Sequence, residues 1–194
     1  MKQTMIRVIP LNDYLKYKKI IQKKMKNGMV FIYSTDTIYG IGCDATNYKA
    51  VERIRKAKQS DKRPYSVIAP SKKWIEKNCV IDKKAKKWIN MLPGPYTLIF
   101  KIKNKNCVAK NITGNKTLGV RIPDNWSASI ARDLKRPVVT TSANLSGESY
   151  MTKLQDLNEK LIRQIDLVIY EGEKRGKPST IVDLTGVKPA VVKR

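Results

Sequence analysis

At 194 residues the chain is long enough for one domain with a full hydrophobic core. Its 40 lysine and arginine residues against 16 acidic residues leave a formal net charge of +24, which favours a polyanionic partner such as nucleotide phosphates or RNA, unless the source proteome is rich in lysine throughout. The chain has no histidine, and this excludes Ser-His-Asp and Cys-His catalysis, HExxH zinc chemistry and an imidazole general base.

Apolar spacing predicts strands and helices mixed along one α/β domain, without a linker or an internal repeat. In chain order we expect a strand at 5–9, a helix at 12–27, a strand at 29–33, a helix at 48–58, a strand at 65–69, helices at 71–78 and 82–91, a turn and strand within 92–100, a polar loop at 103–116, a strand at 117–123, a helix at 127–134, a strand at 137–139, a helix at 152–165, and strands at 167–170 and 179–184. The expected helix N-caps are Asn12 or Asp13, Ser71 and Thr152. Gly28 is expected to end the first helix in the left-handed conformation.

The cysteines and the N-terminal composition indicate a cytoplasmic protein. The three cysteines are odd in number, widely spaced and without a CxxC pair, which favours a reducing compartment over a disulfide framework. The N-terminus lacks an apolar segment long enough for a signal peptide, and no run approaches the ~18 apolar residues of a membrane helix. We therefore expect no membrane partner.

Three segments beside predicted strands are rich in hydroxyl side chains. They are TTSANLSG at 140–147, the turn at 35–37 and the pair at 179–180. Open α/β sheets usually bind ligands where strands end in such residues, whereas a Ser/Asn turn with a helix cap is the simpler alternative. We expect the three segments to converge on one groove. A dinucleotide fingerprint at 40–45 is disfavoured, because its first glycine lies about seven residues beyond the strand.

Cations in two places are candidates for binding anions. Lys56, Lys58, Lys62 and Arg63 gather around a predicted loop, where they either grip phosphates or form solvated surface. Arg121 lies in an otherwise apolar strand, and an unpaired buried charge is very costly. It therefore either forms a structural ion pair or presents a guanidinium fork to a carboxylate or phosphate.

Five segments, taken together and in order, resemble the motifs of the YrdC/Sua5 family. STDTIYGIGCDA resembles the family's P-T-D-T-x-Y-G segment, LPGPYTLIF its PGP-x-T, LGVRIP its V-R-x-P, TTSANLSG its T-S-A-N-x-S-G, and PSTIVDLTG its S-T-V-V-D. They span about residues 30–185. The resemblance implies a single YrdC-like domain over residues 1–194, with a twisted mixed β-sheet flanked by helices and a basic concave groove.

This resemblance implies an L-threonylcarbamoyladenylate synthase, which is a nucleotidyltransferase. Such an enzyme forms threonylcarbamoyl-AMP and pyrophosphate from L-threonine, bicarbonate and ATP, and a separate tRNA threonylcarbamoyltransferase then uses the product. The expected partners therefore also include tRNA or double-stranded RNA. The resemblance implies no tightly bound cofactor and no metal site of the protein itself, with Mg²⁺ carried by ATP. Such a reaction asks mainly for alignment and charge neutralisation, which agrees with a chain that lacks histidine.

The matching motifs assign two sets of binding residues. The L-threonine set is Thr35, Arg121 and Ser179, with the arginine on the substrate carboxylate. The ATP set is Lys58, Lys62, Thr117, Thr140, Ser142 and Arg194. Of these residues, Lys58 and Arg121 are expected to act in catalysis.

Three positions depart from the family pattern. Ser60 stands where the family's K-x-R motif, begun here by Lys58, has arginine; the histidine that many members carry near 67–68 is absent; and the family's R-x-G ending stops at Arg194. The alternative function is that of a non-catalytic, RNA-binding protein of the same fold, of the YciO-like kind, which the positive charge also fits. A carbamoyl-adenylate module of the hydrogenase-maturation type is disfavoured, because the chain lacks that protein's other domains.

Overall fold

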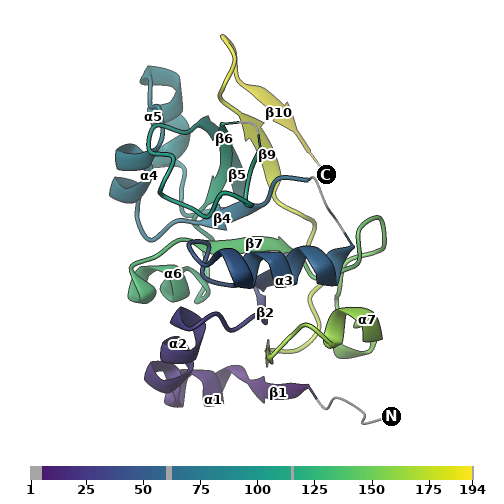
Figure 1. Cartoon of the computed structure of the whole chain (residues 1–194). Coiled ribbons are helices and arrows are strands. Elements are labelled where there is room, and N and C mark those ends of the chain that lie inside the picture. The colour runs from purple at the N-terminus through teal and green to yellow at the C-terminus, as the bar shows by residue number, and fades with distance from the viewer. Residues whose placement is uncertain (1–5, 60–62, 115, 194) are drawn as a thin grey trace.

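Among residues 6–59, 63–114 and 116–193, which the computed structural model describes, ten strands form one mixed sheet (Figure 1). The strands are β1 (Arg7–Pro10), β2 (Phe31–Ser34), β3 (Tyr39–Gly42), β4 (Ser66–Ile68), β5 (Tyr96–Lys101), β6 (Thr117–Arg121), β7 (Val138–Ser142), β8 (Leu167–Tyr170), β9 (Thr180–Asp183) and β10 (Ala190–Val192). Their order across the sheet is β1-β8-β2-β3-β7-β4-β6-β5-β9-β10. Parallel pairs such as β4–β6 and β5–β9 occur beside antiparallel pairs such as β4–β7, so the predicted mixed sheet is confirmed.

Helices cover both faces of the sheet and form a hydrophobic core on each. One core is covered by α1 (Leu11–Lys16), α2 (Lys18–Lys26) and α6 (Ala128–Leu134), and the other by α3 (Tyr48–Lys58), α4 (Lys72–Asn78), α5 (Lys83–Asn90) and α7 (Glu159–Ile162). Side chains alternate between the two cores along a strand. In β2, Ile32 joins the core under α3, whereas Phe31 and Tyr33 join the core under α1 and α2.

Several predicted boundaries are confirmed because local signals set them. The helix α3 has the predicted bounds, and the Asn47 side chain caps it by accepting the N–H of Ala50. The Ser71 side chain caps α4 as predicted, through the N–H of Trp74. Gly28 has a φ of +94°, the left-handed conformation predicted for the end of the first helical segment.

Other elements were predicted wrongly. The helix expected at 12–27 is two helices that meet at Tyr17, and α1 starts after Pro10 rather than at Asn12 or Asp13. Thr152 caps no long helix: its hydroxyl donates to Asp156 within a short turn, and only η1 (Leu154–Asp156), a 3₁₀ helix, and α7 follow. The edge strand β10 was not predicted.

The predictions also missed strand structure in two polar or glycine-rich stretches. β3 occupies Tyr39–Gly42, which the sequence pattern left without a strand. The strand expected at 137–139 continues through Thr140 to Ser142, because these residues pair with β3 and β4, and their side chains line a cavity rather than a core.

In the part of the chain that the structure describes, no helix combines the length and the apolar character that crossing a membrane requires.

Candidate functional site

A cavity of about 320 Å³ lies against six neighbouring strands, β3, β7, β4, β6, β5 and β9. The alternation of side chains along β5 shows on which face of the sheet the cavity lies. Thr97 and Ile99 line the cavity, whereas Leu98 and Phe100 point into the core under α4 and α5. The cavity and these two helices therefore lie on opposite faces of this part of the sheet. Its volume is within the range of small-molecule binding sites.

Hydroxyl groups dominate the walls of the cavity. The serine and threonine residues that line it are Thr35, Thr37, Ser66, Thr97, Thr117, Thr140, Thr141, Ser142 and Ser179. Among the described lining residues, Arg121 is the one that carries a charge. The three hydroxyl-rich segments singled out in the sequence thus converge on one cavity, together with Arg121. The binding roles of the individual residues remain predictions.

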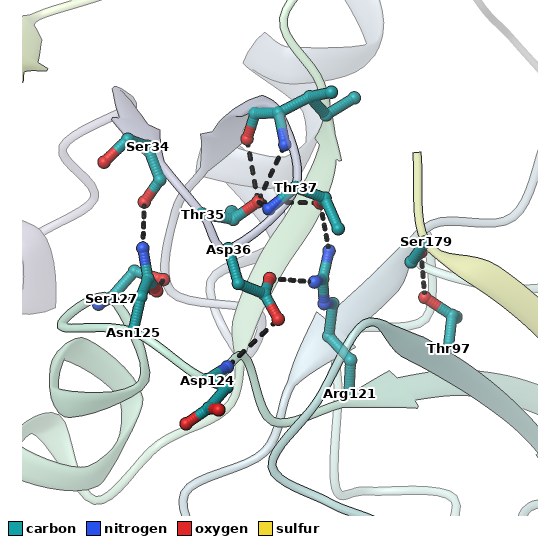
Figure 2. A network of polar contacts seen from close by, with 11 residues as sticks. Ser34, Thr35, Asp36, Thr37, Thr97, Arg121, Asp124, Asn125, Ser127 and Ser179 are labelled. Carbon is teal, nitrogen blue, oxygen red and sulfur yellow. Dashed lines mark hydrogen bonds and ion pairs between the residues drawn. The ribbon is translucent and has the colours of Figure 1, made fainter. Parts of the chain in front are cut away.

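The turn at 35–37 is built around the hydroxyl of Thr35 (Figure 2). This oxygen accepts the N–H groups of Thr37 and Ile38 at 3.1 and 3.2 Å and donates to the carbonyl of Ile38 at 2.7 Å. It also lies 2.9 Å from the hydroxyl oxygen of Thr37. A buried turn whose polar groups are satisfied in this way has a fixed shape, so it can hold its hydroxyls against the cavity.

Arg121, at the end of β6, has both a structural partner and a place in the cavity wall. Its Nη2 forms an ion pair with Oδ1 of Asp36, and its Nη1 lies 3.4 Å from Oγ1 of Thr37 (Figure 2). Its Nε is buried and has no hydrogen-bond partner among the described residues. The structure therefore shows the ion pair that was one of the two alternatives for this arginine, and its binding of a substrate anion stays a prediction.

Ser179 lies just before β9, against the strand that bears Thr97. The two hydroxyl oxygens are 2.8 Å apart, and both side chains are buried. Thr117, Thr140 and Ser142 line the same cavity from β6 and β7. The structure therefore brings together six of the predicted residues: Thr35, Thr117, Arg121, Thr140, Ser142 and Ser179.

Lys58, the last residue of α3, is buried beneath the segment that follows β7. Its ammonium donates to the carbonyl oxygens of Ser142 and Asn144 at 2.7 Å each, and to Oδ1 of Asn144 at 2.8 Å. The three donors of the ammonium are thereby all used. Lys58 is absent from the described cavity lining, so its observed contacts fix the loop after β7, and its contact with ATP stays a prediction.

The other two cations of the predicted ATP set, Lys62 and Arg194, lie outside the described residues. So does Ser60, the position that departs from the family motif. Arg63 is described and exposed. The predicted basic concave groove therefore remains a prediction.

Three residues that contact the predicted ones had been given no role from the sequence. Asp36 holds Arg121, Thr97 pairs with Ser179, and Asn144 receives Lys58. Asp36 and Asn144 stand inside motifs that the sequence had singled out, so motif membership was the signal available for them. Thr97 is the threonine of the PGP-x-T segment, so the same signal was available for it.

Burial, with a smaller effect from Arg63, lowers the pKa of Lys58 from 10.5 to about 8. The folded protein then binds fewer protons on Lys58 than the unfolded chain does between pH 8 and 10.5, so this residue makes the free energy of unfolding rise with pH through that window. We expect the rise to be larger in the wild type than in Lys58→Met by up to roughly 3 kcal/mol. Urea denaturation at pH 7.5 and pH 10.5 measures it.

Lys56→Met is the matched control for this experiment, because Lys56 lies on the same helix and is exposed. It is expected to change the pH dependence by less than ~0.5 kcal/mol. If the free energy of unfolding depends on pH equally in the wild type and in Lys58→Met, burial does not lower the pKa of Lys58.

The fold and the cavity together define a mixed-sheet α/β protein with a hydroxyl-lined site of ligand size. The family model Sua5/YciO/YrdC, described as "Telomere recombination", matches residues 23–194, and the chain belongs to this family. The resemblance noted in the sequence is thereby confirmed.

Relatives and solved structures agree with this assignment. A Methanocaldococcus jannaschii protein named "Putative threonylcarbamoyl-AMP synthase" is 35% identical, over 95% of this chain and 89% of its own length. The crystal structure of Pyrococcus abyssi Sua5 complexed with L-threonine has a TM-score of 0.85 at 28% identity and covers 98% of this chain. The crystal structure of Escherichia coli YciO has a TM-score of 0.85 at 27% identity and covers 98% of this chain and 96% of its own. This chain spans 57% of the Sua5 chain.

Proposed function

We propose that the protein is an L-threonylcarbamoyladenylate synthase. The observation that carries the proposal is Arg121, a buried guanidinium with an unsatisfied Nε, set in the wall of a cavity lined by hydroxyl groups. Such a site suits a small amino acid with a carboxylate and a hydroxyl. Relatives named threonylcarbamoyl-AMP synthase and the threonine complex of Sua5 support the same choice of reaction and substrate.

The proposed reaction has two steps. The amine of L-threonine adds to bicarbonate with loss of water and gives a carbamate. A carbamate oxygen then attacks the α-phosphorus of ATP, the bond from this phosphorus to the β-phosphate bridging oxygen breaks, and pyrophosphate leaves. The protein contributes by aligning the reactants and by placing hydrogen-bond donors and positive charge around them. A chain without histidine can perform this chemistry, because neither step requires an imidazole.

The proposed roles follow the two sets of residues. Thr35, Arg121 and Ser179 hold threonine, and Arg121 grips its carboxylate. Lys58, Lys62, Thr117, Thr140, Ser142 and Arg194 hold ATP, and Mg²⁺ enters as part of the substrate MgATP. The described contacts suggest that Lys58 acts on ATP at least partly through the loop of Ser142 and Asn144, which it fixes.

The product would be used by a separate tRNA threonylcarbamoyltransferase in the cytoplasm. We propose tRNA as a further partner, because the net charge of +24 favours binding to polyanions. The rival function, non-catalytic RNA binding of the YciO-like kind, is not favoured, because the relatives whose names state an activity are synthases.

Incubation with MgATP, labelled bicarbonate and L-threonine tests the proposal. The expected result is labelled threonylcarbamoyl-AMP together with pyrophosphate, and neither appears when threonine is omitted. The absence of product, combined with a salt-sensitive RNA affinity that ATP and threonine leave unchanged, would instead establish the rival function.

A further inference from the structure

We infer that Asp36 is a positioning residue that acts through Arg121. The inference rests on the proposed function, because it concerns how Arg121 is held ready for the substrate carboxylate. The side chain of Asp36 is 10% exposed and that of Arg121 is 6% exposed, so the pair is largely shielded from solvent.

The two carboxylate oxygens of Asp36 bind two different elements (Figure 2). Oδ1 forms the ion pair with Arg121 on β6, and Oδ2 accepts the backbone N–H of Asp124, in the turn after this strand, at 3.0 Å. Asp36 itself lies in the turn that Thr35 fixes internally. The carboxylate therefore joins the turn at 35–37 to the end of β6, and Arg121 is held between them.

The contacts of Arg121 fix the orientation of its guanidinium but leave one hydrogen-bond donor without a partner among the described residues. Asp36 takes Nη2, the hydroxyl of Thr37 lies near Nη1, and Nε keeps its proton without a partner among the described residues. An arginine side chain has several rotatable bonds, and holding it in one arrangement before the ligand arrives improves affinity. Asp36 supplies this orientation without touching the substrate.

Orientation and charge predict opposite effects when Asp36 is neutralised. Asp36→Asn makes the site more positive by one charge, which would tighten the binding of a carboxylate if charge alone mattered. If Asp36 acts by orientation, the same change weakens threonine binding, because the amide holds the guanidinium less firmly than the carboxylate does. The direction of the change in threonine affinity therefore distinguishes an effect of orientation from an effect of charge.

The experiment is a calorimetric titration of L-threonine and of ATP into the wild type, Asp36→Asn, Arg121→Gln and the double variant. We expect Asp36→Asn to weaken threonine binding by about 10–100-fold while the ATP dissociation constant changes less than about threefold. Since Asp36 acts through Arg121, the double variant should bind threonine like Arg121→Gln, within about twofold. A purely structural role would move both ligands together.

Unchanged or tighter threonine binding in Asp36→Asn overturns the inference, as do equal losses for the two ligands or additive losses in the double variant. If Asp36→Asn does not fold, Asp36→Glu replaces it: this variant keeps the charge but displaces the carboxylate, and it too should weaken threonine alone. Wild-type affinity in Asp36→Glu would then overturn the inference. A wild type that binds no threonine refutes the proposed function itself, and the inference with it.

Discussion

Arg121→Ala is expected to abolish threonine-dependent product formation and to weaken L-threonine binding by about 2–5 kcal/mol, the cost of losing a buried, hydrogen-bonded charge pair. The arginine lies in the cavity wall and is buried, so the carboxylate it would bind is shielded from water and the loss is large. ATP binding should change much less. Titration of both ligands, with circular dichroism to confirm that the variant is folded, measures the effect.

Arg132→Ala is the matched control, because Arg132 also contacts an aspartate, Asp133, but has a side chain that is 67% exposed. It should leave threonine binding unchanged. Wild-type threonine affinity in Arg121→Ala would contradict the assigned role. A variant that does not fold would instead favour the purely structural interpretation of the ion pair with Asp36.

The parts of the fold that the sequence predicted well are those set by local signals. The bounds of α3 follow from strong helical spacing between the Asn47 cap and a left-handed C-cap at Gln59. The bounds of β8 follow from four apolar residues between polar ones. The first two helices were predicted as one, because the lysine-rich pattern continues through Tyr17, where the helix breaks.

The strand β3 shows why tertiary contacts escape such reasoning. Two of its four residues are glycines, which local propensity disfavours in strands. A β-carbon on Gly42 would lie 2.8 Å from the carbonyl oxygen of Val139 and from the ring of Tyr33. Glycine is therefore required by the close approach of β7, and nothing within the segment 39–42 itself reveals this.

The candidate site was predictable to a similar degree. Arg121 stood out because a charge in an apolar strand requires a partner, but its partner Asp36 lies 85 positions away in the sequence, and only the fold brings the two together. The same holds for Ser179 and Thr97, which are 82 positions apart. The motifs thus assigned a role to one residue of each pair, and the sheet topology shows which residue is its partner.

Gly176→Ala is expected to reduce the threonine-dependent kcat/KM by roughly 100-fold, because it displaces the segment that carries Ser179 into the site. We call residues 171–178 the strap. Tyr39 and Tyr150 hold it by donating their hydroxyls to the carbonyls of Gly172, at 2.6 Å, and of Gly176, at 3.3 Å. A β-carbon on Gly176 would lie 1.9 Å from the carbonyl oxygen of Thr37, so either the strap or the turn at 35–37 must move.

This displacement affects the proposed threonine site from two sides, since Thr35 lies in that turn and Ser179 directly follows the strap. Initial rates with varied threonine and varied ATP measure it, and the loss should appear with threonine rather than with ATP. Gly114→Ala is the matched control, because a β-carbon there meets no heavy atom within 4 Å, and its rates should equal those of the wild type. Wild-type rates in Gly176→Ala would mean that a methyl group at position 176 does not displace the strap or the turn at 35–37 in the active protein.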